Sequence, residues 1–294
     1  KYGALPQSVM PESYQSSKSR MMNGFLTRKL REFAWVLREM NAKGAKLTDL
    51  RKEKESMLST IYSMLCIFLG NPPETFDWQV KNKDKKLIRF NDLTPLEFCK
   101  KHVNVNLHDK VCLIHSPMSN KKTYQHYTVS YLGNVVDGKI ISYANVEMDD
   151  IKRATVKSLK NNEAVWFGCD VGKMFHRDLG VMNIDLYDYE SVLGTNFNMN
   201  KGTRLEYGDS IMTHAMLFTG VDLVKNQPTK WRVENSWGEK GGNKGYFLMT
   251  DKWFDEYNFE VVIDKKYLPK RILEIFNQEP VALDPWDPMG SLAT

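Results

Sequence analysis

Cysteine is scarce in this sequence, with 4 residues among 294, and these four lack the close spacing that metal-binding cysteines share. The shortage argues against a disulfide framework and favours a reducing compartment, the cytoplasm. Long hydrophobic runs are lacking too. The longest, in "MLSTIYSMLCIFLG", is interrupted by Ser and Thr and falls short of the roughly 20 apolar residues that a bilayer crossing needs. We therefore expect neither a cysteine metal site nor a membrane span.

A large surplus of one charge is also absent, because 41 basic residues face 36 acidic ones and leave a formal net charge of +5. This balance permits weak contact with DNA without arguing for it. The opening stretch "KYGALPQSVMPESY" has neither the basic-then-apolar order nor the cleavage site of a signal peptide, and it reads as if the sequence starts in mid-protein. What is present, 42 % hydrophobic and 12 % aromatic residues, can bury a substantial core.

Residues 1–105 predict a helical subdomain with a short β-hairpin. Four apolar residues at spacings of four, three and four indicate one amphipathic helix: Leu26, Leu30, Phe33 and Leu37. A second helix, capped by Thr48 and ending at Gly70, is expected to pair with it. The runs "FDWQV" and "KLIRF" around "KNKDKK" predict two strands joined by a charged turn, and Thr94 before a proline predicts a further helix start.

Residues 106–268 predict a β-rich part, and residues 269–294 a C-terminal helix followed by an arm. Short runs rich in β-branched and aromatic residues, such as "KVCLIH", "AVWFGCDVG", "HAMLFTGVDLV" and "GYFLMT", are separated by turns, and "DDIKRATVKSLKNN" is the one clear helix among them. The fold class is therefore α+β, with a mainly antiparallel sheet. The ending "VALDPWDPMGSLAT" contains prolines and a glycine and is expected to be extended and non-helical.

The stretch "VENSWGEKGGNKGYFLM", residues 233–249, places a polar Asn-Ser pair between an apolar valine and Trp237 on a predicted strand. A buried amide such as that of Asn235 costs stability unless its hydrogen-bonding groups find partners. The expected partner is His214, 21 positions upstream at the start of an apolar strand. The stretch between them contains the turn formers Asn226, Gln227 and Pro228, so the two strands can be antiparallel neighbours.

An imidazole held by an amide carbonyl keeps one orientation and leaves its second nitrogen free for a third group, as in a cysteine peptidase. A neighbouring imidazolium can lower a cysteine pKa from about 8.5 to roughly 3 or 4 and so produce a nucleophilic thiolate. In this interpretation Asn235 orients His214, and Trp237, on the same face as Asn235, covers their hydrogen bond against water. The alternative is a core histidine without a catalytic role.

The pairs of segments "HA" at 214–215 and "NSWG" at 235–238, with the glycine-rich turn that follows, resemble the papain-like cysteine peptidases. The stretches "LGNPPETFDW", "TPLEFCKKHV", "EAVWFGCDVGK" and "WDPMG" are similar to the bleomycin hydrolase family, the cytosolic aminopeptidase branch. The resemblance covers essentially the whole chain, which looks like the C-terminal two thirds of such a protein. It implies a papain-like α+β fold in which a helical insertion is followed by an antiparallel β-barrel half, and the N-terminal part that bears the nucleophile is absent.

In that family the nucleophilic Cys and the oxyanion Gln lie upstream of the segment that matches "KYGALP", and neither appears in this sequence. Cys169 is the least implausible substitute among the four cysteines. Its neighbour Asp170 would nevertheless oppose a thiolate, and no helix N-terminus is expected beside it. We therefore expect a fragment, or one product of a cleaved precursor, that cannot catalyse alone.

In the same family the C-terminal arm enters the active-site cleft, and its terminal carboxylate binds the free amino group of the substrate. The resemblance assigns that role to Ala293 or Thr294, with Thr294 removable by self-trimming. Pro285 and Pro288 would stiffen this arm, and Gly290 would allow a close approach of the backbone.

The function that the resemblance implies is a cysteine aminopeptidase that removes N-terminal residues from peptides and hydrolyses bleomycin-type amides with a Cys-His-Asn site. It implies no metal or organic cofactor, a homohexamer, and DNA binding in some members. Two alternatives remain open: a catalytically inactive protein that binds nucleic acid through the basic turn 81–86, and a structural subunit. The carboxylates Asp185 and Asp188 are interpreted as part of a solvated loop.

Overall fold

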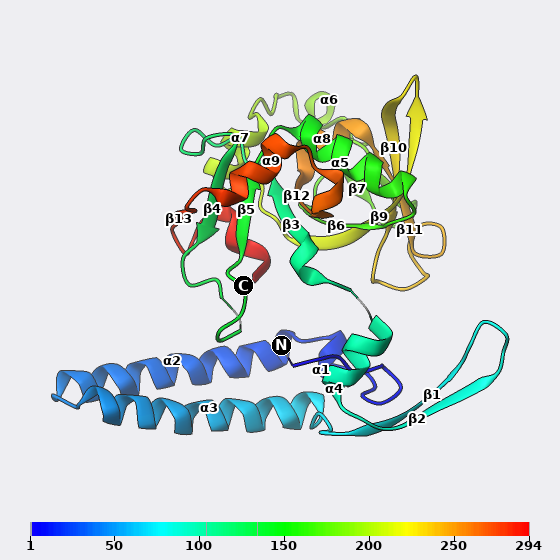
Figure 1. Ribbon diagram of the computed structural model, residues 1–294. Coiled ribbons are helices and arrows are strands. Elements are labelled where there is room, and N and C mark those ends of the chain that lie inside the picture. Colours follow the sequence, from blue (N-terminus) through cyan, green and yellow to red (C-terminus); the bar gives the residue numbers. More distant parts are fainter. Residues whose placement is uncertain (1, 104, 134, 294) are drawn as a thin grey trace. The chain divides into compact units, whose positions relative to one another are not determined.

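The computed structural model describes residues 2–103, 105–133 and 135–293, which fall into two compact units, Lys1–Val105 and Asn106–Thr294 (Figure 1). Each unit has its own buried cluster of side chains.

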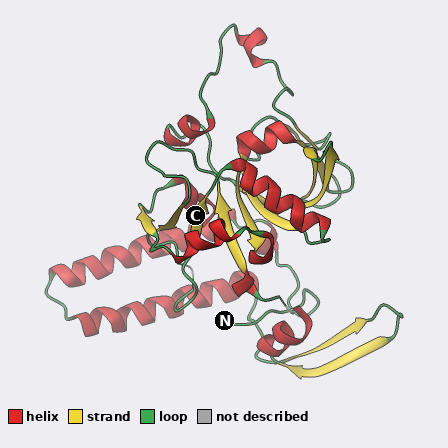
Figure 2. Cartoon of the chain, turned by 45° about the horizontal axis from the view of Figure 1, so that its top comes forward, coloured by secondary structure: helices red, strands yellow, loops and turns green. Residues whose placement is uncertain are grey.

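The first unit is mostly helical. Its helices are α1 (Tyr14–Ser17), α2 (Arg20–Ala42), α3 (Leu47–Leu69), α4 (Pro95–Phe98) and the π-helical turn η1 (Cys99–Val103). Figure 2 shows α2 and α3 side by side as the hairpin that their apolar periodicity predicts. The predicted cap of α3 at Thr48 is wrong, because the N-cap is Lys46, two residues earlier, and its side chain makes no capping bond. The predicted end is correct, since Gly70 stops α3 with a φ of 93°.

The hairpin of this unit pairs β1 (Phe76–Lys81) with β2 (Leu87–Leu93) around an exposed basic turn. The ring of Trp78 stacks on Phe90 at a centroid distance of 5.4 Å and meets Phe98 edge-on at 4.9 Å. These aromatic rings are therefore occupied by packing. The predicted helix start is confirmed, because Thr94 forms a reciprocal capping box at the start of α4.

The second unit is built on one large sheet. Its strands are β3 (Lys110–Ile114), β4 (Gln125–Val129), β5 (Ser142–Asn145), β6 (Val165–Cys169), β7 (Phe175–His176), β8 (Val181–Met182), β9 (His214–Val224), β10 (Gln227–Glu234), β11 (Tyr246–Thr250), β12 (Asn258–Asp264) and β13 (Val281–Leu283). Among the described residues the strand order is β13-β4-β5-β3-β12-β6-β9-β10-β11-β8-β7. The helices are α5 (Met148–Lys160), α6 (Tyr189–Leu193), α7 (Lys201–Glu206), α8 (Asp251–Tyr257) and α9 (Lys270–Leu273), with 3₁₀ turns η2 (Leu107–Asp109), η3 (Lys265–Tyr267), η4 (Glu274–Asn277) and η5 (Pro288–Ala293).

The prediction of a mainly antiparallel sheet is confirmed, with three parallel pairs as exceptions: β3–β5, β4–β13 and β8–β11. The sheet differs from the predicted barrel half in one respect. The described strands form an open order that ends at β13 and β7 rather than a closed ring. In the sheet β5 lies between β3 and β4. It runs antiparallel to β4, the strand before it in the sequence, and parallel to β3.

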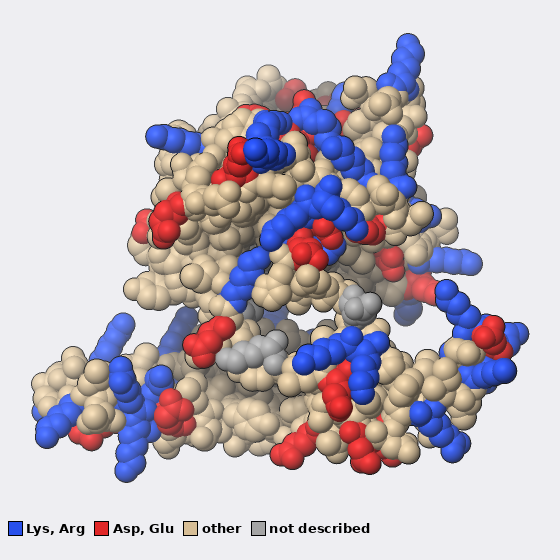
Figure 3. Space-filling model, in the orientation of Figure 1, with Lys and Arg blue, Asp and Glu red and all other residues tan. Residues whose placement is uncertain are grey.

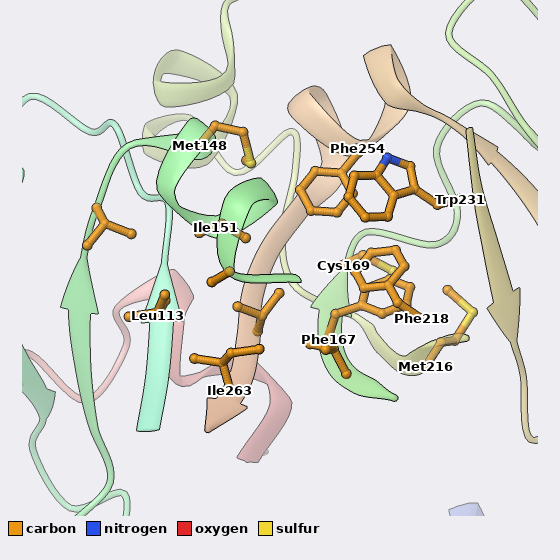
Figure 4. Close-up of a cluster of buried hydrophobic side chains, with 14 of the residues drawn as sticks. Leu113, Met148, Ile151, Phe167, Cys169, Met216, Phe218, Trp231, Phe254 and Ile263 are labelled. Carbon is orange, nitrogen blue, oxygen red and sulfur yellow. The ribbon is translucent and has the colours of Figure 1, made fainter. Parts of the chain in front are cut away.

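A cluster of aromatic side chains fills the space between the sheet and helices α5 and α8 (Figure 4). The ring of Phe218 stacks on Phe167 at 3.8 Å and on Phe254 at 5.1 Å, and Trp231 stacks on Phe254 at 4.7 Å. The indole N–H of Trp231 donates to the carboxylate of Asp251, with a nitrogen-to-oxygen distance of 3.0 Å. Because Phe218 lies on β9 and Trp231 on β10, this core holds the two strands in place.

One acidic residue is buried in the middle of the sheet. Glu260, on β12, is 5 % exposed, and burial raises its pKa from an ordinary 4.5 to about 7, although the Cys112 thiol hydrogen-bonds to it. The folded protein thus favours the neutral acid, whereas the unfolded chain ionises near its ordinary pKa. Stability from this group is fully present below about pH 4.5 and is lost as the pH rises toward 7.

The variant Glu260→Gln is therefore expected to raise the free energy of unfolding by about 3 kcal/mol at pH 8 and to change it little at pH 4. Urea unfolding at the two pH values measures this difference. Glu274→Gln, at an exposed position on η4, serves as the control and should show no such pH dependence. An equal effect of Glu260→Gln at both pH values would contradict the assignment.

Lys and Arg side chains gather on the face of the second unit that carries α5 and α9 (Figure 3). Some basic side chains of α5 and α9 are paired with acids. Lys152 lies 2.7 Å from Asp251 and 2.6 Å from Asp255, and Arg271 contacts Asp150. This pairing reduces the positive charge available to a phosphate backbone, and DNA binding stays a prediction. Within the described residues, no helix combines the length and apolar character needed to cross a bilayer, and no three His, Cys, Asp or Glu side chains converge as metal ligands.

Candidate active site

Strands β9 and β10 form a tight antiparallel hairpin that brings the two predicted residues to one end of the sheet. The turn consists of Lys225 and Asn226, both with left-handed backbone angles (φ 48° and 66°), as in the turns that match the twist of a hairpin. It is shorter than predicted, because Gln227 and Pro228 already belong to β10. Since β9 begins at His214 and β10 ends at Glu234, the residue after β10 lies beside the imidazole.

The His214 ring is hydrogen-bonded to Asn235, with 2.9 Å between Nε2 and Oδ1. The same oxygen accepts the backbone N–H of Ser236 at 2.7 Å, so two donors fix the orientation of the amide. An amide oxygen can only accept, and Nε2 must therefore carry the proton. In the neutral ring Nδ1 is then the free, basic nitrogen. His214 is half-buried and Asn235 is 9 % exposed, so the ring is not sealed within the core.

Trp237 lies against the histidine, but on a bend after β10 rather than on the strand where it was predicted. Its ring centroid is 4.7 Å from that of His214, with 34° between the planes. The side chain is 37 % exposed, so it covers one side of the His–Asn pair only in part. The guanidinium of Arg177 lies 4.4 Å from the centroid of the Trp237 ring. Sequence reasoning missed Arg177, whose surroundings "FHRDLG" carry no motif.

The glycine-rich turn 238–245 holds the backbone of Asn235 through a hydrogen bond. The backbone N–H of Asn235 donates to the carbonyl oxygen of Gly245 at 3.1 Å. Gly242 has a φ of 58°, and a Cβ there would lie 2.4 Å from the carbonyl oxygen of Tyr246. The turn is therefore restricted to glycine at this position, and its shape places the Gly245 carbonyl as an acceptor for the backbone N–H of Asn235.

A buried carboxylate holds the segment that leads into His214. Asp170 is 4 % exposed and accepts the hydroxyl of Ser210 at 2.8 Å and that of Thr213 at 3.5 Å. The backbone N–H of Thr213 also donates to the carbonyl of Cys169 at 2.9 Å. Sequence reasoning considered Asp170 only as a neighbour of Cys169. Its position directly after a buried strand was the one available signal.

Cys169 pairs with His214 in the β6–β9 register, yet its thiol does not face solvent. The residue is 0 % exposed, and burial, with the Asp170 carboxylate next to it, raises the thiol pKa well above its ordinary value. Burial also raises the pKa of Cys112 on β3. Cys169 therefore remains a protonated core residue and is excluded as a substitute nucleophile. Cys66 and Cys99 belong to the first unit.

The C-terminal arm is ordered against the second unit. Strand β13 pairs in parallel with β4, and Met289 is 1 % exposed in a cluster that also contains Met212, two residues before His214. A Cβ at Gly290 would lie 3.2 Å from Val129, which agrees with the predicted close approach. The sequence predicted a non-helical ending. This is wrong for the six residues Pro288–Ala293, which form the 3₁₀ helix η5. Ala293 ends that helix, and Thr294 lies outside the described residues.

Asp185 and Asp188 do not form a catalytic pair. Asp188 caps α6 by accepting the backbone N–H of Ser191 at 3.0 Å, and Asp185 lies 3.8 Å from Lys252. Both line a cavity of about 820 Å³ that neither His214 nor Asn235 lines. The residues that line this cavity include carboxylates but no histidine bonded to an asparagine, so the candidate active site is the one at His214.

Comparisons with known proteins place the chain among peptidases. The model of the family described as Peptidase C1-like matches residues 1–290. The human (Homo sapiens) bleomycin hydrolase is 47 % identical over 299 residues, and the aminopeptidase C of Listeria innocua is 47 % identical over 293 residues. Each alignment covers 100 % of this chain and 66 % of the relative, so the chain spans just under two thirds of their length.

Among solved structures, the crystal structure of PepW from Lactobacillus rhamnosis HN001 superposes with a TM-score of 0.95 at 46 % sequence identity. The match covers 98 % of this chain and 66 % of the PepW chain. The α+β arrangement described above is therefore a papain-like peptidase fold.

Proposed function

The chain belongs to the Peptidase C1-like family, and from that premise we propose that it supplies the catalytic histidine and its positioning asparagine to a cysteine aminopeptidase. The observation that carries the proposal is the bond of 2.9 Å between His214 Nε2 and Asn235 Oδ1. The ring is half-exposed, and among the described residues of the second unit its Nδ1 has no hydrogen-bond partner. Nδ1 is therefore available to a cysteine sulfur. The nucleophilic cysteine of the proposal lies upstream of these residues.

The reaction proposed is acyl transfer. A thiolate attacks the scissile carbonyl, the C–N bond breaks, and Nδ1–H of the His214 imidazolium gives its proton to the leaving amine. In the second half a water molecule attacks the thioester while Nδ1 takes the water's proton, and the thiol is released as thiolate beside the imidazolium. Asn235 keeps the ring in one orientation through both steps, without adding a negative charge that would oppose the thiolate.

The relatives' names supply the substrate class. We propose peptides with a free N-terminus, and amides of the bleomycin type, as substrates. The arm supports the exopeptidase part, since Met289 packs in the same cluster as Met212 near His214, and the proposal places the chain end, at Ala293 or Thr294, against the substrate's amino group. We further propose that the protein is a cytoplasmic homohexamer. In each subunit α2 and α3 belong to a helical insertion, and β3–β13 belong to the second half of the peptidase.

The test uses the full-length protein made from its complete coding sequence. It is expected to hydrolyse an alanyl aminocoumarin substrate and to leave the N-acetylated substrate intact, because the blocked amine cannot meet the chain end. Alkylation with iodoacetamide should abolish the activity. Equal cleavage of both substrates would refute the aminopeptidase assignment, and activity that survives alkylation would refute the thiol mechanism.

A further inference from the structure

Arg177 is an exposed arginine whose guanidinium carbon lies over the Trp237 ring, 4.4 Å from its centroid. Among the described residues its side chain has no carboxylate at ion-pairing distance. A guanidinium that contacts an aromatic ring keeps N–H groups that can donate to an acceptor. Such an edge binds a carboxylate in a bidentate manner.

The backbone holds Arg177 in a fixed place. The residue lies in the turn between β7 and β8, where the N–H of Gly180 donates to the carbonyl of His176 at 2.9 Å. The carbonyl of Gly180 in turn accepts the N–H of Leu248 on β11 at 2.8 Å. A Cβ at Gly180 would lie 2.5 Å from the Cα of Gly242, so this turn sits directly on the glycine-rich turn that supports Asn235.

The chemistry of the site determines which half of a substrate passes this arginine. His214 gives its proton to the leaving amine, so the leaving half of the peptide starts beside the imidazole, whereas the acyl half stays on the sulfur. The centroid of the Trp237 ring lies 4.7 Å from that of the imidazole, and the Arg177 guanidinium lies 4.4 Å from the Trp237 centroid. A leaving half that extends along this side of the imidazole crosses the surface that Trp237 and Arg177 form.

We propose that Arg177 is a specificity-determining residue that binds a carboxylate on the leaving half of the substrate. The inference rests on the proposed peptidase function and adds a substrate class to it, namely peptides whose leaving half is acidic. The carboxylate is either the C-terminus of a short peptide or the side chain of Asp or Glu. Both sources present the same planar anion to the guanidinium.

The experiment measures kcat/KM of the full-length enzyme for two matched pairs of substrates. Ala-Ala against Ala-Ala-NH₂ tests the terminal carboxylate, and Ala-Asp-NH₂ against Ala-Asn-NH₂ tests the side chain. The enzyme is expected to favour the carboxylate in at least one pair by about tenfold, mainly through KM, which corresponds to one good charge-assisted contact. The pair that shows the preference identifies the source.

Variants then assign the preference to a residue. Arg177→Met keeps a long side chain on Trp237 and should bring the carboxylate-to-amide ratio close to one, whereas Arg177→Lys should keep part of it. The matched control is Arg232→Met, because the Arg232 guanidinium also lies over an aromatic ring, that of Tyr246 at 5.2 Å, and extends from β10 toward Thr219 on β9. It should keep the wild-type ratio.

The carboxylate-to-amide ratio of kcat/KM tests the role of Arg177 separately from the peptidase function. A ratio near one in the wild-type enzyme, or a ratio that Arg177→Met leaves unchanged, would overturn the role of Arg177 while the peptidase function stands. Failure to cleave any of the four peptides and the alanyl aminocoumarin substrate would overturn the proposed function and this inference with it.

Discussion

Replacing His214 by alanine in the full-length protein is expected to lower kcat for an alanyl aminocoumarin substrate by about 10³- to 10⁴-fold. Two effects are lost together. In the proposed mechanism the imidazolium lowers the pKa of the nucleophilic cysteine, so its loss leaves less thiolate at neutral pH. No group remains to protonate the leaving amine. Steady-state kinetics at pH 7, with a circular dichroism spectrum to check folding, measures the loss.

The matched variants of this experiment use residues that the structure distinguishes. Asn235→Ala should cause a smaller loss than His214→Ala, because the ring remains but its bond of 2.9 Å does not. His108→Ala, at an exposed histidine in η2, should behave as wild type. If His214→Ala keeps activity within tenfold of wild type, the catalytic role given to the histidine is wrong.

A second large effect is expected from Lys121→Met, measured as a fall of about 3 to 5 kcal/mol in the free energy of unfolding. The Lys121 ammonium lies 2.8 Å from the carboxylate of Asp287 in the arm, and the two side chains are 0 % and 8 % exposed. The carboxylate also accepts the backbone N–H of Met289 at 2.9 Å. Removing the cation leaves a buried negative charge without its partner, which costs far more than a surface pair is worth.

The same variant should loosen the arm before it unfolds the unit. Hydrogen exchange at the amides of 281–290 is expected to accelerate in Lys121→Met more than exchange in β9. Lys270→Met removes an exposed lysine that lies 3.7 Å from Glu274 and should cost less than 1 kcal/mol. A loss below 1 kcal/mol in Lys121→Met, with unchanged exchange in the arm, would show that the pair does not hold the arm in place.

Much of the fold was predictable because its signals are local. The α2–α3 hairpin follows from apolar spacing, and β9 and β10 follow from alternation on either side of a turn-forming stretch. Strand β12, near the middle of the sheet, was missed. Its sequence "NFEVVID" contains Asn258 and Glu260, which read as surface residues, yet both are buried. Only neighbouring strands on both sides explain that burial, and sequence spacing does not show them.

By itself, the sequence determined that His214 begins one strand and that Asn235 follows the end of its neighbour, because a short hairpin brings its two ends together. Tertiary structure alone decided what surrounds that pair. Cys169 became a core thiol as a member of the buried cluster that also contains Phe218, and Arg177 reached Trp237 because β8 pairs in parallel with β11, far along the chain. Long-range pairing sets those positions, and no local pattern of residue types encodes which strands will lie side by side.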